Sequence, residues 1–459
     1  MKMSGFLRTI KPKNVFYSFL LISFLLSFCA TPMVFASSSS NDWPMFHNDL
    51  THTGYSTSTP TATSAVQLWN YTTQSVVWAS PVVVGGYVYI PSDDGSVYCL
   101  DALNGTKIWN YSTHGPVGSS AAVTDGYVYV GSYDRNVYCL NASTGDKVWN
   151  FTTENSVESC PAVADGRVYV GSWDGNVYCL DALTGAKIWN YTAGGLVESS
   201  PAVADGRVYV GSTNFNVYCL DALSGAEIWK CTTGNVVQSS PAVVNGYLYI
   251  GSEDNNVYCL SASNGSKIWN YTTPGWVDSS PAVANGYVYV GSWELGADSY
   301  DIASNVYCLD ASTGMKIWNY TTHGGVNSSP AVAGSYVYVG GWDGNFYCLD
   351  ASTGAEVWSY TTGSHVNSSP AVAGGFVYVG SWDHNVYAFG ASPAAVTPSP
   401  SVSPSLNPSL SPSEQTTTSP TPQPTQSLPA EIIYTVAAVI VVAVVVAVVL
   451  LLRRRKHLT

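Results

Sequence analysis

Aromatic residues recur in the sequence just before short turns rich in Asp, Gly and Asn, as in Trp173-Asp174-Gly175-Asn176. The aromatic position is occupied by Tyr133, Trp173, Trp293, Trp342 and Trp382. Asp, Gly and Asn accept tight turn geometry, so we interpret the Asp as structural. Exposed aromatic rings, in contrast, are common anchors for sugars and protein partners. We predict that the five aromatic residues project from one rim of the fold as a candidate ligand surface; packing on the adjacent loop is the alternative.

Residues that could hold a metal ion are scattered along the chain. The histidines His114, His323, His365 and His384 have no Cys or acidic partner at ligand spacing, so we treat them as loop residues. Residues 294–304 contain Glu294, Asp298 and Asp301, which could supply a weak calcium site. Calcium prefers six to eight oxygen ligands, however, and a solvated loop is the favoured interpretation. We therefore predict no metal site.

The ten cysteines follow the pattern of a repeat and do not indicate a disulfide framework. Seven of them stand ten residues before a recurring Trp, at Cys99, Cys139, Cys179, Cys219, Cys259, Cys308 and Cys348. Equivalent positions in packed sheets lie about 10 Å apart, beyond the roughly 7 Å that a disulfide can bridge between Cα atoms. We expect free, buried thiols at these positions. Nothing in the sequence indicates whether Cys160 or Cys231 is paired.

A second series of tryptophans sets the period of the chain. Its members are Trp69, Trp109, Trp149, Trp189, Trp229, Trp269, Trp318 and Trp358. The spacing is 40 residues, with one nine-residue insertion before Trp318, whereas the dipeptide Trp-Asp occurs only at Trp173, Trp342 and Trp382. The second series therefore defines the repeat. A period near 40 with four short strands per unit is typical of a β-propeller.

Eight repeats can be counted from starts such as Ser199-Ser200-Pro201-Ala202-Val203. The last repeat stops at Phe389, without a fourth strand, and residues 67–71 supply the missing one from the other end of the chain. Pro stands near the first strand in seven of the eight repeats and is tolerated only at a sheet edge, so this strand should be innermost. We predict an all-β, eight-bladed propeller of four-stranded blades, closed by N-terminal and C-terminal strands.

The stretch Leu180-Asp181-Ala182-Leu183-Thr184-Gly185-Ala186-Lys187-Ile188-Trp189 resembles the tryptophan-docking motif of PQQ-like (pyrroloquinoline-quinone-like) propellers. In that family each Trp packs on the next blade, so the resemblance implies a blade-docking role for the second Trp series. The resemblance covers residues 43–391 and includes the segment that starts at Asn41-Asp42-Trp43. Members include quinoprotein alcohol dehydrogenases and non-catalytic propellers such as the outer-membrane assembly lipoprotein of the BAM complex.

The resemblance to the dehydrogenases does not extend to their described active site. That site is said to hold a tricarboxylate cofactor and calcium through Arg and acidic or amide ligands, usually beside a vicinal disulfide. This sequence has no adjacent cysteines, and the only Arg residues of the propeller region, Arg135, Arg167 and Arg207, lie in predicted turns. Acids such as Glu158 and Glu198 stand only at the starts of the innermost strands. We expect no catalytic residue, no cofactor and no enzyme activity; a quinoprotein oxidoreductase is the alternative.

The two ends of the chain predict export and a membrane anchor. We assign residues 1–36 to a signal peptide, 37–66 to an N-terminal lead-in and 67–391 to the propeller. A Pro/Ser/Thr-rich stalk at 392–431 precedes an uncharged segment at 432–452 that is long enough for one transmembrane helix. Basic residues at 453–459 place the tail in the cytoplasm. The prediction is a type I cell-surface protein with an extracellular propeller, similar in layout to archaeal surface proteins.

The charge of the chain limits the classes of partner that it could bind. Of the 17 basic residues, eight lie in the two terminal segments, which leaves nine against 30 acids. A surface of this charge does not suit nucleic acid. We predict a binding or scaffold module for an extracellular protein or glycan, with the membrane as a further partner. Glycosylation sequons stand at Asn70, Asn104, Asn110, Asn141, Asn150, Asn190, Asn264, Asn270, Asn319, Asn327 and Asn367.

Overall fold

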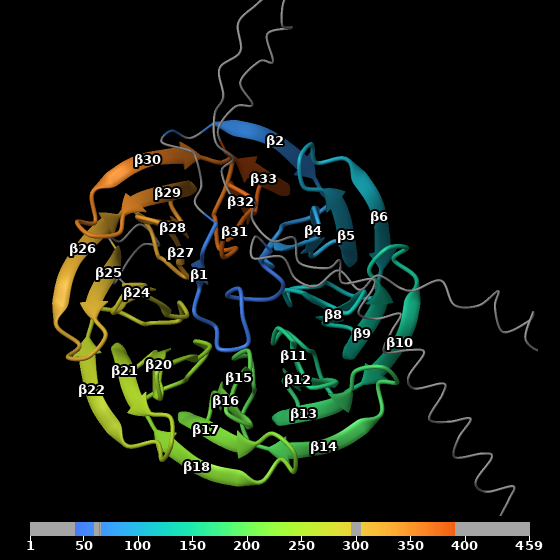
Figure 1. Cartoon of the computed structure of the whole chain (residues 1–459), viewed down its shortest axis with the longest axis horizontal. Helices are drawn as coiled ribbons and strands as arrows, with labels where there is room; N and C mark the ends of the chain where they lie inside the picture. Colours follow the sequence, from blue (N-terminus) through green and yellow to red (C-terminus); the bar gives the residue numbers. More distant parts are fainter. Residues whose placement is uncertain (1–41, 59–63, 65, 295–303, 391–459) are drawn as a thin grey trace, which may run out of the picture. The chain divides into compact units, whose positions relative to one another are not determined.

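The computed structural model describes residues 42–58, 64, 66–294 and 304–390. Apart from a short strand at the N-terminus, these residues form eight four-stranded antiparallel sheets around a central channel (Figure 1). The predicted all-β, eight-bladed propeller is confirmed. The signal peptide, stalk, transmembrane segment and tail predicted from the sequence lie outside the described residues. Within the described residues, no helix is long and apolar enough to cross a membrane.

Each blade contributes one strand to each of four concentric layers. The innermost strands are β3 (Val82–Val84), β7 (Ala122–Thr124), β11 (Ala162–Ala164), β15 (Ala202–Ala204), β19 (Ala242–Val244), β23 (Ala282–Ala284), β27 (Ala331–Ala333) and β31 (Ala371–Ala373). The second strands are β4 (Tyr87–Pro91), β8 (Tyr127–Gly131), β12 (Arg167–Gly171), β16 (Arg207–Gly211), β20 (Tyr247–Ser252), β24 (Tyr287–Gly291), β28 (Tyr336–Gly340) and β32 (Phe376–Gly380). The third strands are β5 (Ser96–Asp101), β9 (Asn136–Asn141), β13 (Asn176–Asp181), β17 (Asn216–Asp221), β21 (Asn256–Ser261), β25 (Ser304–Asp310), β29 (Asn345–Asp350) and β33 (Asn385–Phe389). The outer strands are β6 (Lys107–Ser112), β10 (Lys147–Thr152), β14 (Lys187–Thr192), β18 (Glu227–Thr232), β22 (Lys267–Thr272), β26 (Lys316–Thr322), β30 (Glu356–Thr361) and β2 (Gln67–Thr72).

Strand β2 closes the ring from the N-terminal side. It pairs antiparallel with β33, with Trp69 opposite Ala388 and Tyr71 opposite Val386. The eighth blade is thus the sheet β2-β33-β32-β31, assembled from both ends of the propeller sequence (Figure 1). Closure leaves no open end at which a further blade could add.

A ring of hydrogen bonds joins the eight blades around the channel. The backbone N–H of the residue before each innermost Pro, or before Ala121 in the second blade, donates to the side chain of its counterpart in the next blade. The donors are Ser80, Ser120, Cys160, Ser200, Ser240, Ser280, Ser329 and Ser369. The last bond, from Ser369 to the Ser80 hydroxyl at 3.0 Å, completes the circle. These bonds satisfy donors that no strand partner reaches, which explains the recurring Ser at this position.

The second Trp series joins neighbouring blades farther from the axis. The Trp189 indole donates to the carbonyl of Ala222 in the next blade at 3.1 Å. Its ring covers Gly225, where an added Cβ would lie 2.7 Å from the indole and where φ is +73°. The same indole-to-carbonyl bond is made by Trp69, Trp109, Trp149, Trp229, Trp269 and Trp318. Trp358, in the seventh blade, packs against Phe389 with ring centroids 5.8 Å apart.

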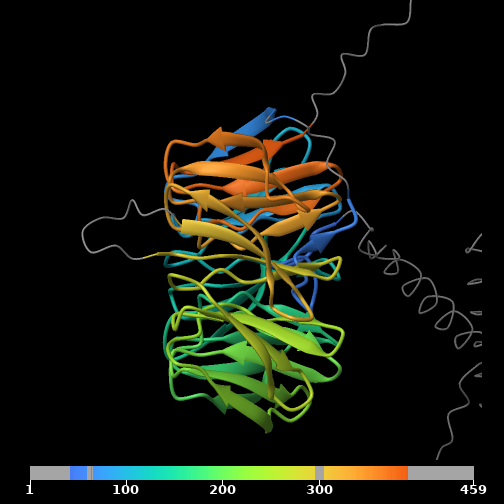
Figure 2. The same cartoon turned by 90° about the vertical axis from the view of Figure 1, so that its left-hand side faces the viewer.

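The N-terminal lead-in crosses the centre of the ring on one face (Figures 1 and 2). Its carbonyl groups accept hydrogen bonds from the inner edges of six blades. The donors are the backbone N–H groups of Val83, Val123, Val203, Val243, Val283 and Val332. Strand β1 (Tyr55–Ser56) then pairs in parallel with β27. The lead-in therefore acts as a shared partner for edges that the blades alone would leave open.

Two buried histidines hold the lead-in in place. His47 and His52 are both nearly inaccessible to solvent, and burial lowers the pKa of His47 to about 3 and that of His52 to about 4. The charge of His52 also contributes to lowering the pKa of His47. The Nδ1 atom of neutral His52 donates to the carbonyl of Pro241 at 3.1 Å.

Removing a docking indole should weaken the propeller strongly. We expect Trp189→Ala to lower the free energy of unfolding by about 3–5 kcal/mol, because it deletes a large buried side chain and its hydrogen bond. Urea denaturation followed by circular dichroism measures the loss. The adjacent Ile188 is 44% exposed, and Ile188→Ala serves as the control, with a change of about 0.5 kcal/mol or less. Equal losses for the two variants would contradict a docking role for Trp189.

The seating of the lead-in can be tested at Gly54. At this residue φ is +62°, and an added Cβ would lie 2.8 Å from the Cβ of Ala282. Gly86 has φ of +83° but open space around its Cβ position. Both Gly→Ala changes introduce backbone strain, so the difference between them isolates the steric clash. We expect Gly54→Ala to lower the melting temperature more than Gly86→Ala does; a smaller effect at Gly54 would show that the lead-in is not held tightly.

Candidate binding site at the channel mouth

Two rings of side chains surround the end of the channel opposite the lead-in. The channel ring is formed by the residue before each Ser-Ser, Ala-Ser or Ser-Cys pair: Trp78, Gly118, Glu158, Glu198, Gln238, Asp278, Asn327 and Asn367. The turn ring is formed by the residue two positions after the end of each second strand, or directly after it in β20: Asp93, Tyr133, Trp173, Thr213, Glu253, Trp293, Trp342 and Trp382. The channel ring precedes the innermost strands, whereas the turn at Gly85 that contacts the lead-in follows one of them. The two features therefore occupy opposite faces.

Backbone hydrogen bonds hold the turn ring over the channel ring. The N–H of Trp173 donates to the carbonyl of Ser156, and that of Trp382 to the carbonyl of His365, both at 2.9 Å. In every blade, the backbone N–H of the turn-ring residue donates in the same way. The acceptor is the carbonyl of the residue that stands two positions before a channel-ring residue. The side chains lean inward as a result: a Cβ added at Gly118 would lie 3.2 Å from the Tyr133 hydroxyl.

Aromatic rings form a continuous wall along part of the mouth. We define the aromatic wall as Trp276, Trp293, Trp342, His365, Trp382 and Trp78. Centroids lie 5.7 Å apart for Trp276 and Trp293, 4.7 Å for Trp293 and Trp342, 5.9 Å for Trp342 and Trp382, and 5.1 Å for Trp382 and Trp78. The imidazole of His365 stacks on Trp342 at 5.1 Å, so this histidine is part of the wall and is not an isolated loop residue.

The five aromatic residues singled out from the sequence are half-buried in the structure. We predicted that these rings project from the rim. They do not project, because each one packs on a neighbour. Tyr133 and Trp173 form a separate pair, with centroids 5.5 Å apart. The structure thus favours the alternative given above, packing of the rings on adjacent loops, and the packed rings line part of the mouth.

Acidic residues occupy the blades beside the wall. We define the acid arc as Glu158, Glu198, Glu253 and Asp278, from the third to the sixth blade. Burial, together with the charges of Glu158 and Glu253, raises the pKa of Glu198 to about 7. Burial likewise raises the pKa of Asp278 to about 7, reinforced by Glu253 and Glu198. These mutual effects show that the four carboxyl groups share one electrostatic environment.

Glu158 and Asp93 extend the acidic environment toward the first blades. Burial raises the pKa of Glu158, and a hydrogen bond with Tyr133 opposes the rise. Burial also raises the pKa of Asp93. No residue of either ring is Lys or Arg. The mouth therefore carries negative charge with no basic ring residue to balance it.

Several polar atoms of the channel ring are buried without a hydrogen-bond partner. They include Oδ1 of Asp278, Oδ1 of Asn327, and both Oδ1 and Nδ2 of Asn367. Asn367 is only 7% exposed. Unpaired buried polar groups cost free energy, and in native proteins they gather where a ligand or an ordered water completes the site.

The same observation corrects the glycosylation prediction at the mouth. Asn367 is too buried to fit a glycan acceptor, and Asn327 is half-buried, with its Oδ1 shielded from solvent. The sequon residues of the outer strands are exposed: Asn70, Asn110, Asn150, Asn190, Asn270 and Asn319. Asn104 and Asn264 are exposed in turns, whereas Asn141 is half-buried and accepts hydrogen bonds from the N–H groups of Ser143 and Thr144.

The remaining sequence candidates have structural roles. The Asp174 carboxylate accepts hydrogen bonds from the Tyr178 hydroxyl at 2.8 Å and the N–H of Asn176 at 3.0 Å. All nine cysteines among the described residues are free, and eight of them are buried. Asp298 and Asp301 lie outside the described residues. Among the described residues, no group of three or more His, Cys, Asp or Glu could hold a metal ion.

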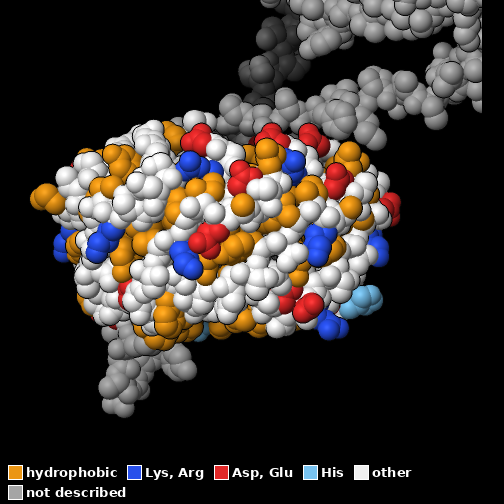
Figure 3. All heavy atoms as spheres, turned by 90° about the horizontal axis from the view of Figure 1, so that it is seen from below, with side chains coloured by type: hydrophobic (Ala, Val, Ile, Leu, Met, Phe, Trp, Pro, Cys, Tyr) orange, Lys and Arg blue, Asp and Glu red, His pale blue; other side chains and the backbone are white. Residues whose placement is uncertain are grey.

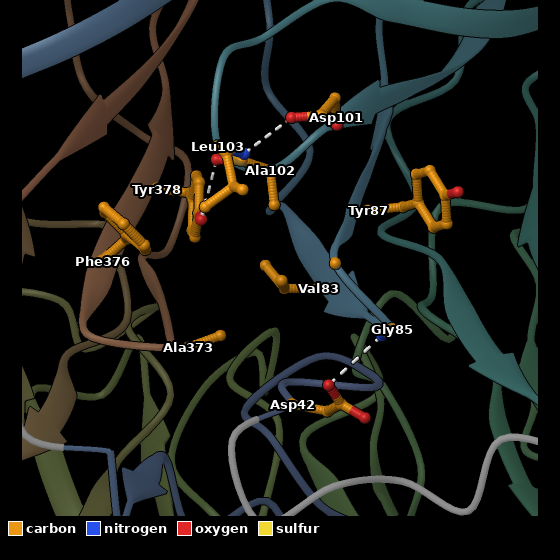
Figure 4. Close-up of a pocket in the computed structure, with 12 residues that line it drawn as sticks. Asp42, Val83, Gly85, Tyr87, Asp101, Ala102, Leu103, Ala373, Phe376 and Tyr378 are labelled. Carbon is orange, nitrogen blue, oxygen red and sulfur yellow. Dashed lines mark hydrogen bonds between the residues drawn. The ribbon is translucent and has the colours of Figure 1, made fainter.

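Two hollows open on the lead-in face of the propeller. One, of about 480 Å³, is lined by Val83, Tyr87, Leu103 and Phe376, and the Asp42 carboxylate at its edge accepts the N–H of Gly85 at 3.2 Å (Figure 4). Several of the polar groups drawn there are hydrogen-bonded to one another, as when Tyr378 donates to the Ala102 carbonyl at 3.1 Å (Figure 4).

The second hollow, of about 900 Å³, runs past the second, third and fourth blades. It is lined by Leu50, Tyr127, Arg167, Leu183 and Leu223 among others, and its surface is mainly apolar. This hollow also contains Tyr and Asp side chains and the unpartnered Nε of Arg167, but neither hollow has a run of stacked indoles or several unpartnered acceptor oxygens as the mouth does. The mouth is therefore the better candidate site.

Comparison with known protein families identifies the repeat. The family model described as outer membrane protein assembly factor BamB matches residues 60–120, 93–232, 213–300 and 302–397. The chain belongs to this PQQ-like, BamB-type repeat family. Comparison with curated proteins gives no match.

Solved structures with the same fold include both classes expected from the family. BamB from Moraxella catarrhalis is 21% identical, with a TM-score of 0.60 over 71% of this chain and 97% of that one. A europium-containing methanol dehydrogenase is 16% identical, with a TM-score of 0.67 over 77% and 98% of the two chains. The quinohemoprotein alcohol dehydrogenase from Comamonas testosteroni is 18% identical, with a TM-score of 0.66 over 77% and 81%. At these identities the likeness shows the fold alone.

The raised pKa values at the mouth predict a pH-dependent stability. Glu198 and Asp278 favour protons in the folded state, so their stabilising contribution is complete below about pH 4 and is lost as the pH rises through 7. We expect the melting temperature to fall between pH 5.5 and pH 8.5. Asp278→Asn should reduce that fall by about 2 °C or more, because it removes a buried charge.

An exposed acid provides the control for this measurement. Glu154 is exposed in the turn between the second and third blades, and Glu154→Gln changes the net charge by the same amount. Its melting curve should follow that of the unmodified protein at both pH values. An Asp278→Asn protein with an unchanged pH dependence would contradict the electrostatic description of the mouth.

Proposed function

We propose that this chain is a non-catalytic binding propeller that holds an extracellular protein or glycan ligand at the channel mouth. The observation that carries the proposal is the convergence of the aromatic wall, the acid arc and the unpartnered channel-ring atoms at one end of the channel. Aromatic rings supply contact area at little entropic cost, and buried polar groups that lack partners gain hydrogen bonds when a ligand arrives.

The mouth does not fit the cofactor of the quinoprotein relatives. A tricarboxylate would face Glu158, Glu198 and Asp278, whose pKa values are already raised by burial and by neighbouring carboxylates. Positive groups are placed elsewhere: Arg135 is exposed at a turn tip, and Arg207 donates to the Ala262 carbonyl at 2.9 Å. Because a trianion gains no counter-charge from the two rings, the donor set argues against the quinoprotein alternative.

Display on the outer side of a membrane is the second part of the proposal. It is supported by the signal peptide assigned to residues 1–36, the stalk at 392–431, the uncharged segment at 432–452 and the basic tail. Exposed sequons on the outer strands suit a glycosylated surface protein. One side of the propeller wall carries Lys and Arg singly among polar and hydrophobic side chains, which does not suit a nucleic-acid partner (Figure 3).

Binding at the mouth can be measured on the full-length protein. A glycan array and cross-linking to surface proteins of the native membrane would identify ligands, and Trp382→Ala should reduce binding about tenfold or more. Tyr247 is 41% exposed at the opposite face, so Tyr247→Ala is the matched control and should bind normally. Unchanged binding in Trp382→Ala would remove the mouth as the site. Stoichiometric uptake of pyrroloquinoline quinone with calcium, followed by absorbance, would overturn the non-catalytic proposal.

A further inference from the structure

Three neighbouring channel-ring residues present oxygen acceptors without partners. Asp278, Asn327 and Asn367 come from the sixth, seventh and eighth blades, and each has a buried Oδ1 that accepts no hydrogen bond. Equivalent positions in these blades are fixed to one another by the ring of bonds from Ser280 to Ser329 and from Ser329 to Ser369, at 2.9 and 3.0 Å. The three residues therefore occupy successive, fixed positions at one side of the mouth.

The same three blades carry the centre of the aromatic wall. Trp293, Trp342 and Trp382 are the turn-ring residues of the sixth, seventh and eighth blades, and their rings form a series with centroids 4.7 and 5.9 Å apart. Each indole belongs to the same blade as one of the unpartnered oxygens. An aromatic face attracts a cation, and it does so more strongly when the site is shielded from water.

The charge of the mouth selects the sign of the ligand. Asp278 lies beside Glu253 and Glu198, since both raise its pKa, and neither ring contains Lys or Arg. A cation would relieve the repulsion among these carboxylates, whereas an anion would increase it. A calcium ion matches this arrangement less well, because it prefers six to eight oxygen ligands and the three acceptors supply at most half of them.

An ammonium group has three hydrogen-bond donors and no acceptor, which matches three acceptor oxygens and an adjoining aromatic wall. We propose, on the basis of the binding function proposed above, that the channel mouth binds an alkylammonium group. The nitrogen donates to Oδ1 of Asp278, Asn327 and Asn367, and the alkyl chain lies along the indoles of Trp293, Trp342 and Trp382. Such a group is carried by a lysine side chain of a partner protein or by a free amine.

The test measures binding of small probes to the full-length protein in detergent at pH 8 and low salt, by calorimetry. The cationic probes are n-butylammonium and Nα-acetyl-lysine methylamide. The neutral probe is Nα,Nε-diacetyl-lysine methylamide, which keeps the chain and removes the charge, and calcium chloride is the metal probe. We expect the two cations to bind with a Kd on the order of 1 mM or tighter, and the neutral probe to bind at least about tenfold more weakly.

Matched variants connect binding to the three acceptors. Asp278→Asn keeps the shape of the side chain and should weaken binding of both cations about tenfold or more, because it removes the charge nearest the ammonium. Glu154→Gln removes an exposed charge outside both rings and should leave binding unchanged. Circular dichroism checks that each variant is folded, and Trp382→Leu, with an expected loss of about threefold or more, provides a second route if Asp278→Asn does not fold.

The outcomes separate this inference from the proposed function. Tighter binding of the lysine derivative than of n-butylammonium supports a protein-borne group, and equal binding supports a free amine. Equal binding of the neutral probe, no loss in Asp278→Asn, or displacement of the amine by calcium would each overturn the ammonium site. If a glycan or surface protein still binds at the mouth while no amine does, the ammonium proposal fails and the binding function stands.

Discussion

The contact on which the propeller depends is an indole lying on a glycine of the next blade. Trp189 reaches across to Gly225 and the Ala222 carbonyl, and the repeat places the same contact between one blade and the next around the ring. A side chain at that glycine would clash with the indole. The position therefore requires a residue without a Cβ atom that adopts a positive φ. Seven joints between blades have this contact, and Trp358 packs against Phe389 at the remaining one, so that the ring closes with β33 paired to β2.

The blades are joined by the docking indoles and by the ring of serine hydrogen bonds. The channel-ring side chains are therefore not needed to hold one blade to the next. That freedom lets the position hold Trp, Gly, Glu, Gln, Asp or Asn between neighbours that hardly change. It also lets the molecule retain groups that a core would reject, such as the buried carboxyl of Asp278 and the unpartnered amide of Asn367. Local rules of packing and polar satisfaction are broken most often where a protein binds something, and here the exceptions collect at the mouth.

The sequence predicted the architecture well because the fold is built from local, repeated contacts. Period, strand number, the docking Trp series and the source of the closing strand can all be read along the chain. The mouth could not be predicted in the same way, because Glu198 influences the pKa of Asp278 only when the folded ring brings their blades around one channel. The signal was nevertheless present: the position before Ser-Ser varies among polar residues while its neighbours repeat. Trp78 and Trp276 escaped notice because they stand outside the position that holds the other aromatic residues.

The lead-in was predicted as a separate segment, and its contacts show why sequence patterning misses it. It binds six blades through backbone carbonyls, which leave no trace in side-chain periodicity. It also makes the two ends of the channel different, since it occupies one face and leaves the mouth on the other.

A ring of eight nearly identical blades offers eight equivalent sites, so selecting a single ligand requires that the symmetry be broken. The lead-in breaks it along the axis. The substitutions of the two rings break it around the axis, where the acid arc spans the third to sixth blades and the main run of Trp rings spans the sixth to eighth. The sixth blade alone belongs to both, through Asp278 and Trp293. Negative charge and aromatic surface are adjacent at this blade. The sixth blade therefore differs from the other blades of an otherwise symmetric ring and is the place where a ligand would bind in one orientation.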